Sequence, residues 1–304
     1  STGKTKLKSV YDPTCGSGGL LLNCALHLKD EGKEYRTLKL YGQEINLLTS
    51  AIARMNMFMH GIEEFDIVRG DTLANPGLIK NDELKKFNVI LANPPYSIKS
   101  WDRKSFESDP FGRNLWGTPP QGCADYAFQQ HIQKSLDVEN GRSISLWPHG
   151  ILFRDAEADM RRKMLEEDLV ECVIGLGPNL FYNSPMEACL LITKTNKEKR
   201  KKGEILIINA IQDVRQDKNI SYLEPNHIEK IYNAYKAYKD EEGYCKVVSI
   251  QDVLSHKASL NMALYVSNVD TSKEKVSLNE ALSTLETSSR NLVMSMDQLF
   301  RELS

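Results

Sequence analysis

The chain has 304 residues, of which 41% are apolar, and its formal net charge is −2 at pH 7. This length and apolar content allow a buried core, so a disordered chain is not expected. A charge so close to zero excludes a global basic field that would attract a polyanion. Any contact with nucleic acid must therefore come from a local patch or from another subunit.

The sequence holds no run of about 18 apolar residues that could cross a bilayer, and its first residues lack the apolar region of a signal peptide. We therefore expect a cytoplasmic protein without membrane contact. Six cysteines are scattered, without a CxxC pair, and no spacing of histidine and cysteine suggests a zinc cage. We expect reduced thiols and no metal site.

Short β-like runs alternate with helical patterns in the first third of the chain. The predicted strands are 7–12, 37–45, 65–71 and 87–93, and the predicted helices are 19–31 and 46–61. In the second of these helices, apolar side chains lie near one face: Leu47, Ile52, Met55 and Met59. Such alternation predicts an α/β fold with a parallel sheet and helices on both faces.

The middle of the chain continues this pattern less clearly. Residues 97–122 have no periodicity and predict a long ordered loop over a site. The segments that follow are a helix at 123–137, a strand at 141–148, a helix at 157–167 and a strand at 169–176. Residues 188–210 contain two apolar runs around a Lys/Arg-rich linker, which predicts an antiparallel hairpin.

The composition changes after about residue 211, where Lys, Glu and Tyr become frequent and a helix is predicted at 226–239. Residues 275–303 contain no Gly or Pro, and apolar side chains recur at spacings of three, four and seven: Leu278, Leu282, Leu285, Leu292, Met296, Leu299 and Leu303. A long amphipathic helix of ~42 Å is predicted. It could pack on its own domain or on a partner helix. We therefore divide the chain into 1–210, 211–274 and 275–304.

The first candidate site is the turn DPTCGSGG at 12–19, between a predicted strand and a predicted helix. Glycines let a backbone turn tightly and approach a ligand closely, and a helix N-terminus offers unpaired N–H groups. The turn lacks both the Gly-Lys-Ser/Thr of a phosphate loop and a full GxGxxG pattern. It predicts a small-ligand site, although a purely structural turn is an equal alternative on this feature alone.

Two carboxylates end the next two predicted strands. Glu44 ends the second strand, where a carboxylate can accept hydrogen bonds from both hydroxyls of a ribose. A surface Glu that caps the helix at Asn46 is the alternative. Asp71 ends the third strand, where it can accept from an adenine amino group, although taken alone it would more often be a helix N-cap.

The fourth strand ends in Asn93-Pro94-Pro95-Tyr96, on the same edge of the predicted sheet. The Asn93 side chain and the Pro94 backbone each offer a carbonyl oxygen, and prolines fix the chain direction. Two acceptors facing one exocyclic amine would withdraw the nitrogen lone pair from ring conjugation, while Tyr96 offers a face on which a base can stack. The alternative is a turn that simply ends a strand.

With these features in order, the chain resembles the S-adenosylmethionine-dependent amino-methyltransferases, and DPTCGSGGLL and NPPY resemble the adenine-N6 DNA methyltransferases. Four further segments resemble the modification (M) subunit of type I restriction-modification systems: WGTPPQGCADYAFQQHIQKSL, WPHGILFRDAEADMRRKML, LVECVIGLGPNLFYNSPMEACLLITK and GYCKVVSIQDV. The resemblance extends from about residue 8 to the C-terminus. It implies a Rossmann-like methyltransferase sheet with a C-terminal antiparallel hairpin and a C-terminal helical extension.

The resemblance also implies roles for individual residues. The target-amine site would consist of Asn93, Pro94, Pro95 and Tyr96, without a metal. The S-adenosylmethionine site would consist of Asp12, Thr14, Cys15, Gly16, Ser17, Gly18, Glu44, Asp71 and Thr72. The target adenine would be flipped out of the duplex before transfer.

Residues 1–210 would then be the catalytic domain, 211–274 an extension packed on it, and 275–304 a helix that docks on another subunit. The implied partners are DNA, a specificity subunit that reads the sequence, a second M subunit and a restriction subunit. The chain departs from the family in lacking its helical N-terminal region, so we expect weak cofactor binding by the chain alone. A silent assembly subunit, a stand-alone methyltransferase, or an NPPY enzyme acting on RNA or protein glutamine are the alternatives.

Overall fold

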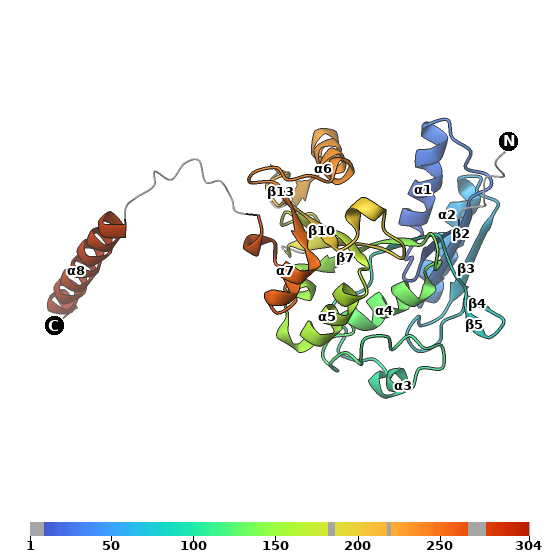
Figure 1. Cartoon of the computed structure of the whole chain (residues 1–304), viewed down its shortest axis with the longest axis horizontal. Coiled ribbons are helices and arrows are strands. Elements are labelled where there is room, and N and C mark those ends of the chain that lie inside the picture. The colour runs from blue at the N-terminus through green and yellow to red at the C-terminus, as the bar shows by residue number, and fades with distance from the viewer. Residues whose placement is uncertain (1–8, 182–185, 218–219, 267–277, 304) are drawn as a thin grey trace. The chain divides into compact units, whose positions relative to one another are not determined.

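The computed structural model of the chain describes residues 9–181, 186–217, 220–266 and 278–303 (Figure 1), with side chains of the last helix described for 282–296. Its contacts divide into two units, Ser1–Ser267 and Asn268–Ser304. Among the described residues, none of the helices combines the length and the apolar character that crossing a membrane requires.

The first unit is built on one nine-stranded sheet. Five neighbouring strands, β3-β2-β1-β6-β7, run parallel, and the sheet continues through β9, β8, β10 and β13. The strands of this sheet are β1 (Ser9–Asp12), β2 (Lys39–Glu44), β3 (Phe65–Arg69), β6 (Val89–Ala92), β7 (Arg142–Pro148), β8 (Val170–Leu176), β9 (Ala188–Lys194), β10 (Glu204–Ala210) and β13 (Cys245–Ser249). Two small hairpins are separate: β4 (Ile79–Lys80) with β5 (Glu83–Leu84), and β11 (Arg215–Asp217) with β12 (Ile220–Tyr222).

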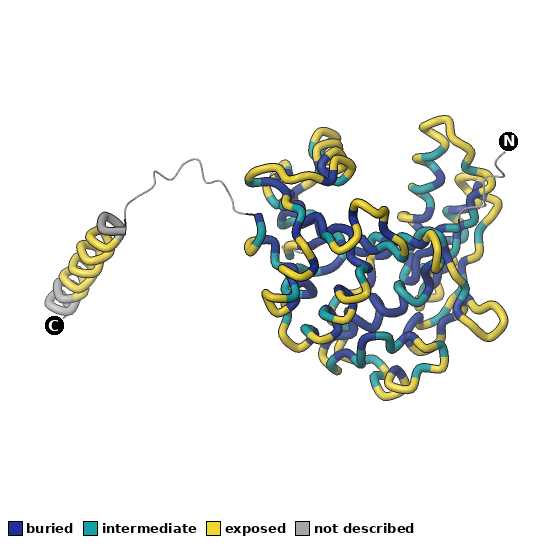
Figure 2. Tube along the Cα trace, in the orientation of Figure 1, coloured by how far each residue is buried: buried dark blue, intermediate teal, exposed yellow. Residues whose placement is uncertain are grey.

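Helices cover both faces of this sheet (Figure 1). On one face α1, α2 and α6 pack on the strands, and on the other α4, α5 and α7 do so. The helices are α1 (Gly19–Asp30), α2 (Leu47–Met59), α3 (Arg103–Glu107), α4 (Asp125–Ser135), α5 (Ala158–Glu166), α6 (Pro225–Ala237), α7 (Ile250–Ser255) and α8 (Leu278–Leu303). More than half of the residues in the strands of the main sheet are buried, and β8 is buried along its whole length (Figure 2).

The predicted fold class is confirmed: the protein is mixed α/β with a large, mostly parallel sheet. Each strand and helix predicted up to residue 176 is present within a few residues of its expected bounds. The alternation of apolar residues explains the two layers, because successive side chains of a strand point to opposite faces. In β1, Val10 contacts the cluster under α1 and α2, whereas Tyr11 contacts the cluster under α4.

The pairing predicted for residues 188–210 is wrong, because β9 and β10 are not neighbours. β8 lies between them, antiparallel to β9 and parallel to β10. The Lys-rich linker is therefore no exposed hairpin turn but crosses the start of β8. There Lys197 binds the carboxylate of Asp168 at 2.6 Å, and Lys201 binds Glu171 at 2.9 Å, with both lysines buried.

The apolar side chains that lie near one face of α2 are exposed. Met57, Ala53 and Ser50 face the sheet and are fully buried, whereas the predicted stripe is exposed: Leu47, Ile52, Met55 and Met59. The small side chains of Ala53 and Ser50 allow the helix to lie close to β2 and β3. Apolar residues occur on both sides of this helix, so periodicity alone does not determine which side is buried.

The predicted loop at 97–122 is largely irregular and contains the short helix α3. It packs on α4, and its first residues also reach the pocket described below, which Ile98 lines. Trp116 is buried, its backbone N–H donates to the side-chain carbonyl of Gln130 at 2.6 Å, and its ring packs edge-on against Tyr126. This cover explains why nearly every residue of α4 is buried, including polar ones.

The C-terminal part contains two elements that bear on the predicted division. Within the first unit, β13 extends the main sheet by pairing antiparallel with β10. The predicted long terminal helix is present as α8. All its described side chains, residues 282–296, are exposed (Figure 2). The start of the prediction, 275–277, lies outside the described residues.

Candidate active site

A pocket of about 470 Å³ lies where β1, β2, β3 and β6 end. These strands are parallel neighbours, so their carboxyl ends meet at one edge of the sheet, where open α/β sheets bind ligands. Eight of the thirteen predicted site residues line it: Thr14, Glu44, Asp71, Thr72, Asn93, Pro94, Pro95 and Tyr96. The structure thus brings the two predicted sites, cofactor and target amine, into one cavity.

The Gly-rich turn after β1 is held by the buried Asp12 carboxylate, which accepts the N–H of Thr14 at 2.9 Å. Gly16 and Gly18 have φ of 54° and 80°, in the left-handed region that favours glycine. A Cβ at Gly18 would lie 2.8 Å from the terminal methyl of Met57, so this side chain of α2 would have to shift. The side-chain oxygen of Thr14 is buried without a hydrogen-bond partner among the described residues.

Glu44 joins this turn to the start of α2. One carboxylate oxygen accepts the N–H of Gly16 at 3.0 Å, and the other accepts the N–H of Asn46 at 2.8 Å. The Asn46 side chain in turn caps α2 by accepting the N–H of Thr49. Both interpretations of Glu44 thus have support, because it caps the helix start and also lines the pocket. A carboxylate oxygen has two lone pairs, so each can still accept a hydroxyl.

The turn after β3 carries Asp71 and Thr72. One Asp71 oxygen, Oδ1, accepts the N–H groups of Leu73 and Ala74 at 2.8 and 3.1 Å. Asp71 therefore fixes a local turn through Oδ1 and also lines the pocket. The Thr72 hydroxyl donates to the Pro13 carbonyl at 2.5 Å, so this turn is tied to the Gly-rich turn.

The Asn93–Tyr96 turn forms the wall of the pocket at the end of β6. Asn93 is exposed, Tyr96 is half-buried, and the Tyr96 hydroxyl donates to the Asn93 side-chain carbonyl at 2.5 Å. Burial, with the neighbouring Cys189 and Asp125 groups, raises the pKa of Tyr96 to about 12, so this hydroxyl stays protonated and acts as a donor. The Asn93 side-chain oxygen thus already accepts a hydrogen bond from Tyr96, its neighbour in the pocket wall.

Five predicted cofactor residues do not line the pocket: Asp12, Cys15, Gly16, Ser17 and Gly18. Cys15 packs in the core beside Gly42, where a Cβ would lie 2.8 Å from the cysteine sulfur. Burial raises the pKa of the Cys15 thiol well above its usual value, so it stays neutral. These residues shape the turn, and direct contacts with a cofactor stay a prediction for them.

Asp12 is the most perturbed carboxyl beside the pocket. Its burial, together with the nearby Glu44 charge, raises the pKa of Asp12 to about 7, although the hydrogen bond from Thr14 opposes this. A carboxyl with this pKa changes charge near neutral pH. A cationic ligand in the pocket would favour the ionised form.

Several pocket residues escaped the sequence reasoning. Gln43, Ile98 and Phe128 line the cavity. Gln43 belongs to the strand that ends in Glu44. Its position next to a predicted ribose-binding residue could have indicated that it lines the pocket. Phe128 comes from α4, far along the chain, and only the packing of α4 beneath the sheet edge brings it here.

Arg113 supports the pocket from behind without lining it. Its guanidinium donates to the backbone carbonyls of Thr72 and Leu73 at 2.8 and 2.7 Å, and its partner is the buried carboxylate of Asp109 at 2.6 Å. The loop at 97–122 thus braces the Asp71–Thr72 turn. No spacing in the sequence indicated this contact.

The comparisons with known proteins agree with this geometry. Residues 2–274 match the family described as N-6 DNA Methylase. The type I restriction enzyme MjaVIII methylase subunit of Methanocaldococcus jannaschii is 33% identical, with 91% of this chain and 48% of that protein covered. The type I restriction enzyme MpnII methylase subunit of Mycoplasma pneumoniae is 32% identical, with 99% of this chain and 56% of that protein covered.

Among solved structures, a type I restriction-modification methyltransferase subunit from Streptococcus thermophilus superposes with a TM-score of 0.79 at 33% identity. The match covers 88% of this chain and 56% of that one. The chain therefore spans about half the length of the curated relatives it matches. Since the family match extends over most of the sequence, the chain belongs to the N-6 DNA methylase family.

Proposed function

We propose that the chain is the catalytic part of a modification subunit of a type I restriction-modification system. It would transfer a methyl group from S-adenosylmethionine to the N6 amine of adenine in DNA. The observation that carries this proposal is the common pocket: Asn93–Tyr96 shares one cavity with Glu44, Asp71 and Thr14. A methyl donor and an amine acceptor can meet there.

The residues present fit a nucleoside cofactor. The pocket volume of about 470 Å³ is within the ordinary range for small-molecule sites. The buried Thr14 hydroxyl oxygen lacks a partner among the described residues, as expected for a group whose partner is a ligand. Glu44 would accept the ribose hydroxyls and Asp71 the adenine amino group. The cofactor, when bound, supplies a methyl group on a sulfonium centre.

On the target side, the Asn93 side chain and the Pro94 backbone carbonyl would accept the two N–H groups of the adenine amine. The nitrogen lone pair is then directed toward the methyl donor, and the rate gain comes mainly from alignment and from these acceptors. The Tyr96 hydroxyl donates to the Asn93 carbonyl oxygen, and the second lone pair of that oxygen can accept an N–H group of the adenine amine as the base stacks on the ring. Stacking of this kind contributes about 1–3 kcal/mol.

The family membership and the named relatives favour DNA over RNA or protein glutamine as the substrate. We propose that sequence choice comes from a specificity subunit, and that a second modification subunit and a restriction subunit complete the assembly. The near-neutral charge of the chain supports the proposal that another subunit supplies much of the contact with DNA. The cytoplasmic location stays a prediction.

The test is transfer of radiolabelled methyl groups to DNA by the chain supplied with a specificity subunit. Asn93→Ala should reduce transfer by a factor of at least about 100, the usual loss when a positioned acceptor is removed. Its cofactor affinity, measured by calorimetry, should change little. Asn140→Ala is the matched control, because Asn140 is exposed in the turn before β7, at the opposite edge of the sheet.

Full activity of Asn93→Ala would contradict the assigned role. Absence of transfer to DNA by the wild-type assembly, together with measurable transfer to RNA or to a protein, would contradict the substrate.

A further inference from the structure

Ser97 directly follows the proposed target site and has an unusual backbone. Its φ of 52° lies in the left-handed region, which is unfavourable for a residue with a Cβ. The Ser97 N–H donates to Oδ1 of Asp125 at 2.8 Å. This hydrogen bond ties the end of the Asn93–Tyr96 turn to the first residue of α4.

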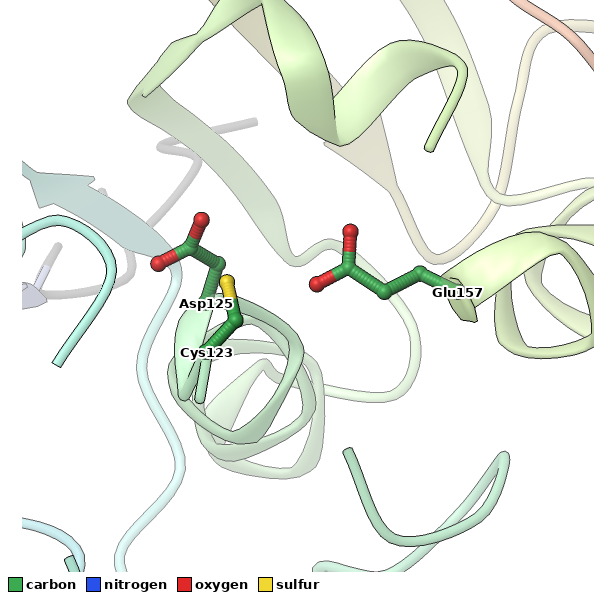
Figure 3. Close-up of side chains that lie close together, drawn as sticks. All are labelled: Cys123, Asp125 and Glu157. Atoms are coloured by element: carbon green, nitrogen blue, oxygen red, sulfur yellow. The ribbon is translucent and has the colours of Figure 1, made fainter. Parts of the chain in front are cut away.

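Asp125 is fully buried and belongs to a charged cluster behind the pocket. Its second oxygen accepts from Nη2 of Arg154 at 2.5 Å, and Nε of Arg154 donates to Glu157 at 2.8 Å. The Cys123 sulfur and a carboxylate oxygen of each acid lie within 4.8 Å of one another. Figure 3 shows the Glu157 side chain, from the segment before α5, extending toward Cys123 and Asp125 at the start of α4.

The contacts of this cluster fit an ion-pair network better than a cation site. The Arg154 guanidinium already lies between the two carboxylates. Burial raises the pKa of the Cys123 thiol to about 12, so the sulfur stays protonated and is a poor metal ligand. Burial also raises the pKa of Glu157, while Arg154 opposes this shift.

We propose that Asp125 is a positioning residue for methyl transfer. Its buried carboxylate, held by Arg154, stabilises the left-handed backbone at Ser97 and thereby fixes the direction of the Asn93–Tyr96 turn. The role in transfer rests on the function proposed above. The contact itself can be tested without any activity.

The structural test is amide hydrogen exchange of residues 94–100 in the 304-residue chain. Asp125→Ala should increase the exchange rate at Ser97 at least about tenfold, because the N–H loses its buried acceptor. Asp168→Ala is the matched control: Asp168 also joins a lysine and a backbone N–H, those of Lys197 and Gly203, but far along the sheet. Unchanged exchange at Ser97 in Asp125→Ala would overturn the proposal.

The functional test is the kinetics of methyl transfer with a specificity subunit. Asp125→Ala should lower kcat about 10- to 100-fold and leave the KM for the cofactor within about twofold, because the cofactor residues are untouched. A second change, Ser97→Gly, should recover part of this loss, since glycine adopts the left-handed backbone without support. A merely structural role of Asp125 would not produce this recovery.

The two tests separate the possible failures. If the wild-type assembly transfers no methyl group, the proposed function fails, and the exchange rates still decide whether Asp125 holds Ser97. If Asp125→Ala does not fold, Asp125→Asn replaces it; this variant loses the charge that Arg154 holds in place, so exchange at Ser97 should rise and kcat should fall, and no change in either would overturn the proposal. Equal kcat losses in Asp125→Ala and in the double variant would contradict positioning through Ser97.

Discussion

At the scale of single residues, the buried carboxyl of Asp12 makes the stability of the protein depend on pH. Its pKa is raised to about 7 by burial and by the Glu44 charge, whereas an unfolded Asp titrates near 3.9. The folded state therefore binds more protons than the unfolded state between about pH 4 and pH 7. By linkage, this residue makes the free energy of unfolding fall as pH rises through that window.

We expect Asp12→Asn to remove this dependence. The variant should be more stable than the wild type at pH 8 by about 1–4 kcal/mol, and the two should converge near pH 4. An asparagine oxygen can still accept the N–H of Thr14, so the turn should survive. Urea unfolding at pH 4, 6 and 8 measures the difference, with exposed Asp66→Asn as the control.

A constant difference in stability between wild type and Asp12→Asn at all three pH values would contradict the raised pKa. Added S-adenosylmethionine should oppose the wild-type loss at high pH, because a cationic ligand favours the ionised carboxylate. This effect should be absent in Asp12→Asn.

At the scale of elements, the apolar residues of α2 do not all lie on its buried face. Met57 is buried against Gly18 of the Gly-rich turn, whereas Met55, two residues earlier, is 58% exposed. Met57→Ala should lower the free energy of unfolding by about 2–5 kcal/mol, as usual for truncation of a buried side chain. Met55→Ala should change it by less than about 0.5 kcal/mol.

Denaturant unfolding of the two variants measures this contrast directly. Equal losses, or a larger loss in Met55→Ala, would mean that the apolar stripe of α2 is buried after all. The Met57 variant should also weaken cofactor binding, because Gly18 and α2 pack against each other.

The same comparison shows how far periodicity determines elements. Strands such as β1 and β6 were predictable because short apolar runs stop at strong breakers, Pro13 and Pro94. The order of strands was not, because the Lys-rich linker after β9 is equally compatible with a hairpin and with a crossing over β8. Only the buried pairs of Lys197 and Lys201 with carboxylates at the start of β8 distinguish these arrangements.

For the site, strand-end residues such as Glu44, Asp71 and Asn93 were predictable because parallel strands end at a common edge. Residues that support them from other elements were not. Arg113 and Asp125 lie in or after the long loop, and their contacts depend on how that loop packs on α4. Sequence reasoning finds the ends of strands more readily than the side chains that hold them.

At the scale of the whole molecule, α8 has an apolar stripe with no assigned contact. Leu282, Leu285, Leu292 and Met296 are 48–66% exposed. Exposed apolar side chains at this helical spacing are typical of a surface that meets a partner helix. We propose that this stripe binds helices of the specificity subunit.

The prediction concerns α8 in the assembly. Leu285→Glu combined with Leu292→Glu should abolish co-purification with a specificity subunit, because two charges would have to be buried in an apolar contact. Asn291→Glu adds a charge on the other side of α8 and should leave the complex intact. Both variants should unfold in denaturant like the wild-type chain, since these side chains are exposed. A complex retained by the double variant, or lost equally in Asn291→Glu, would show that the stripe of α8 is not the docking surface.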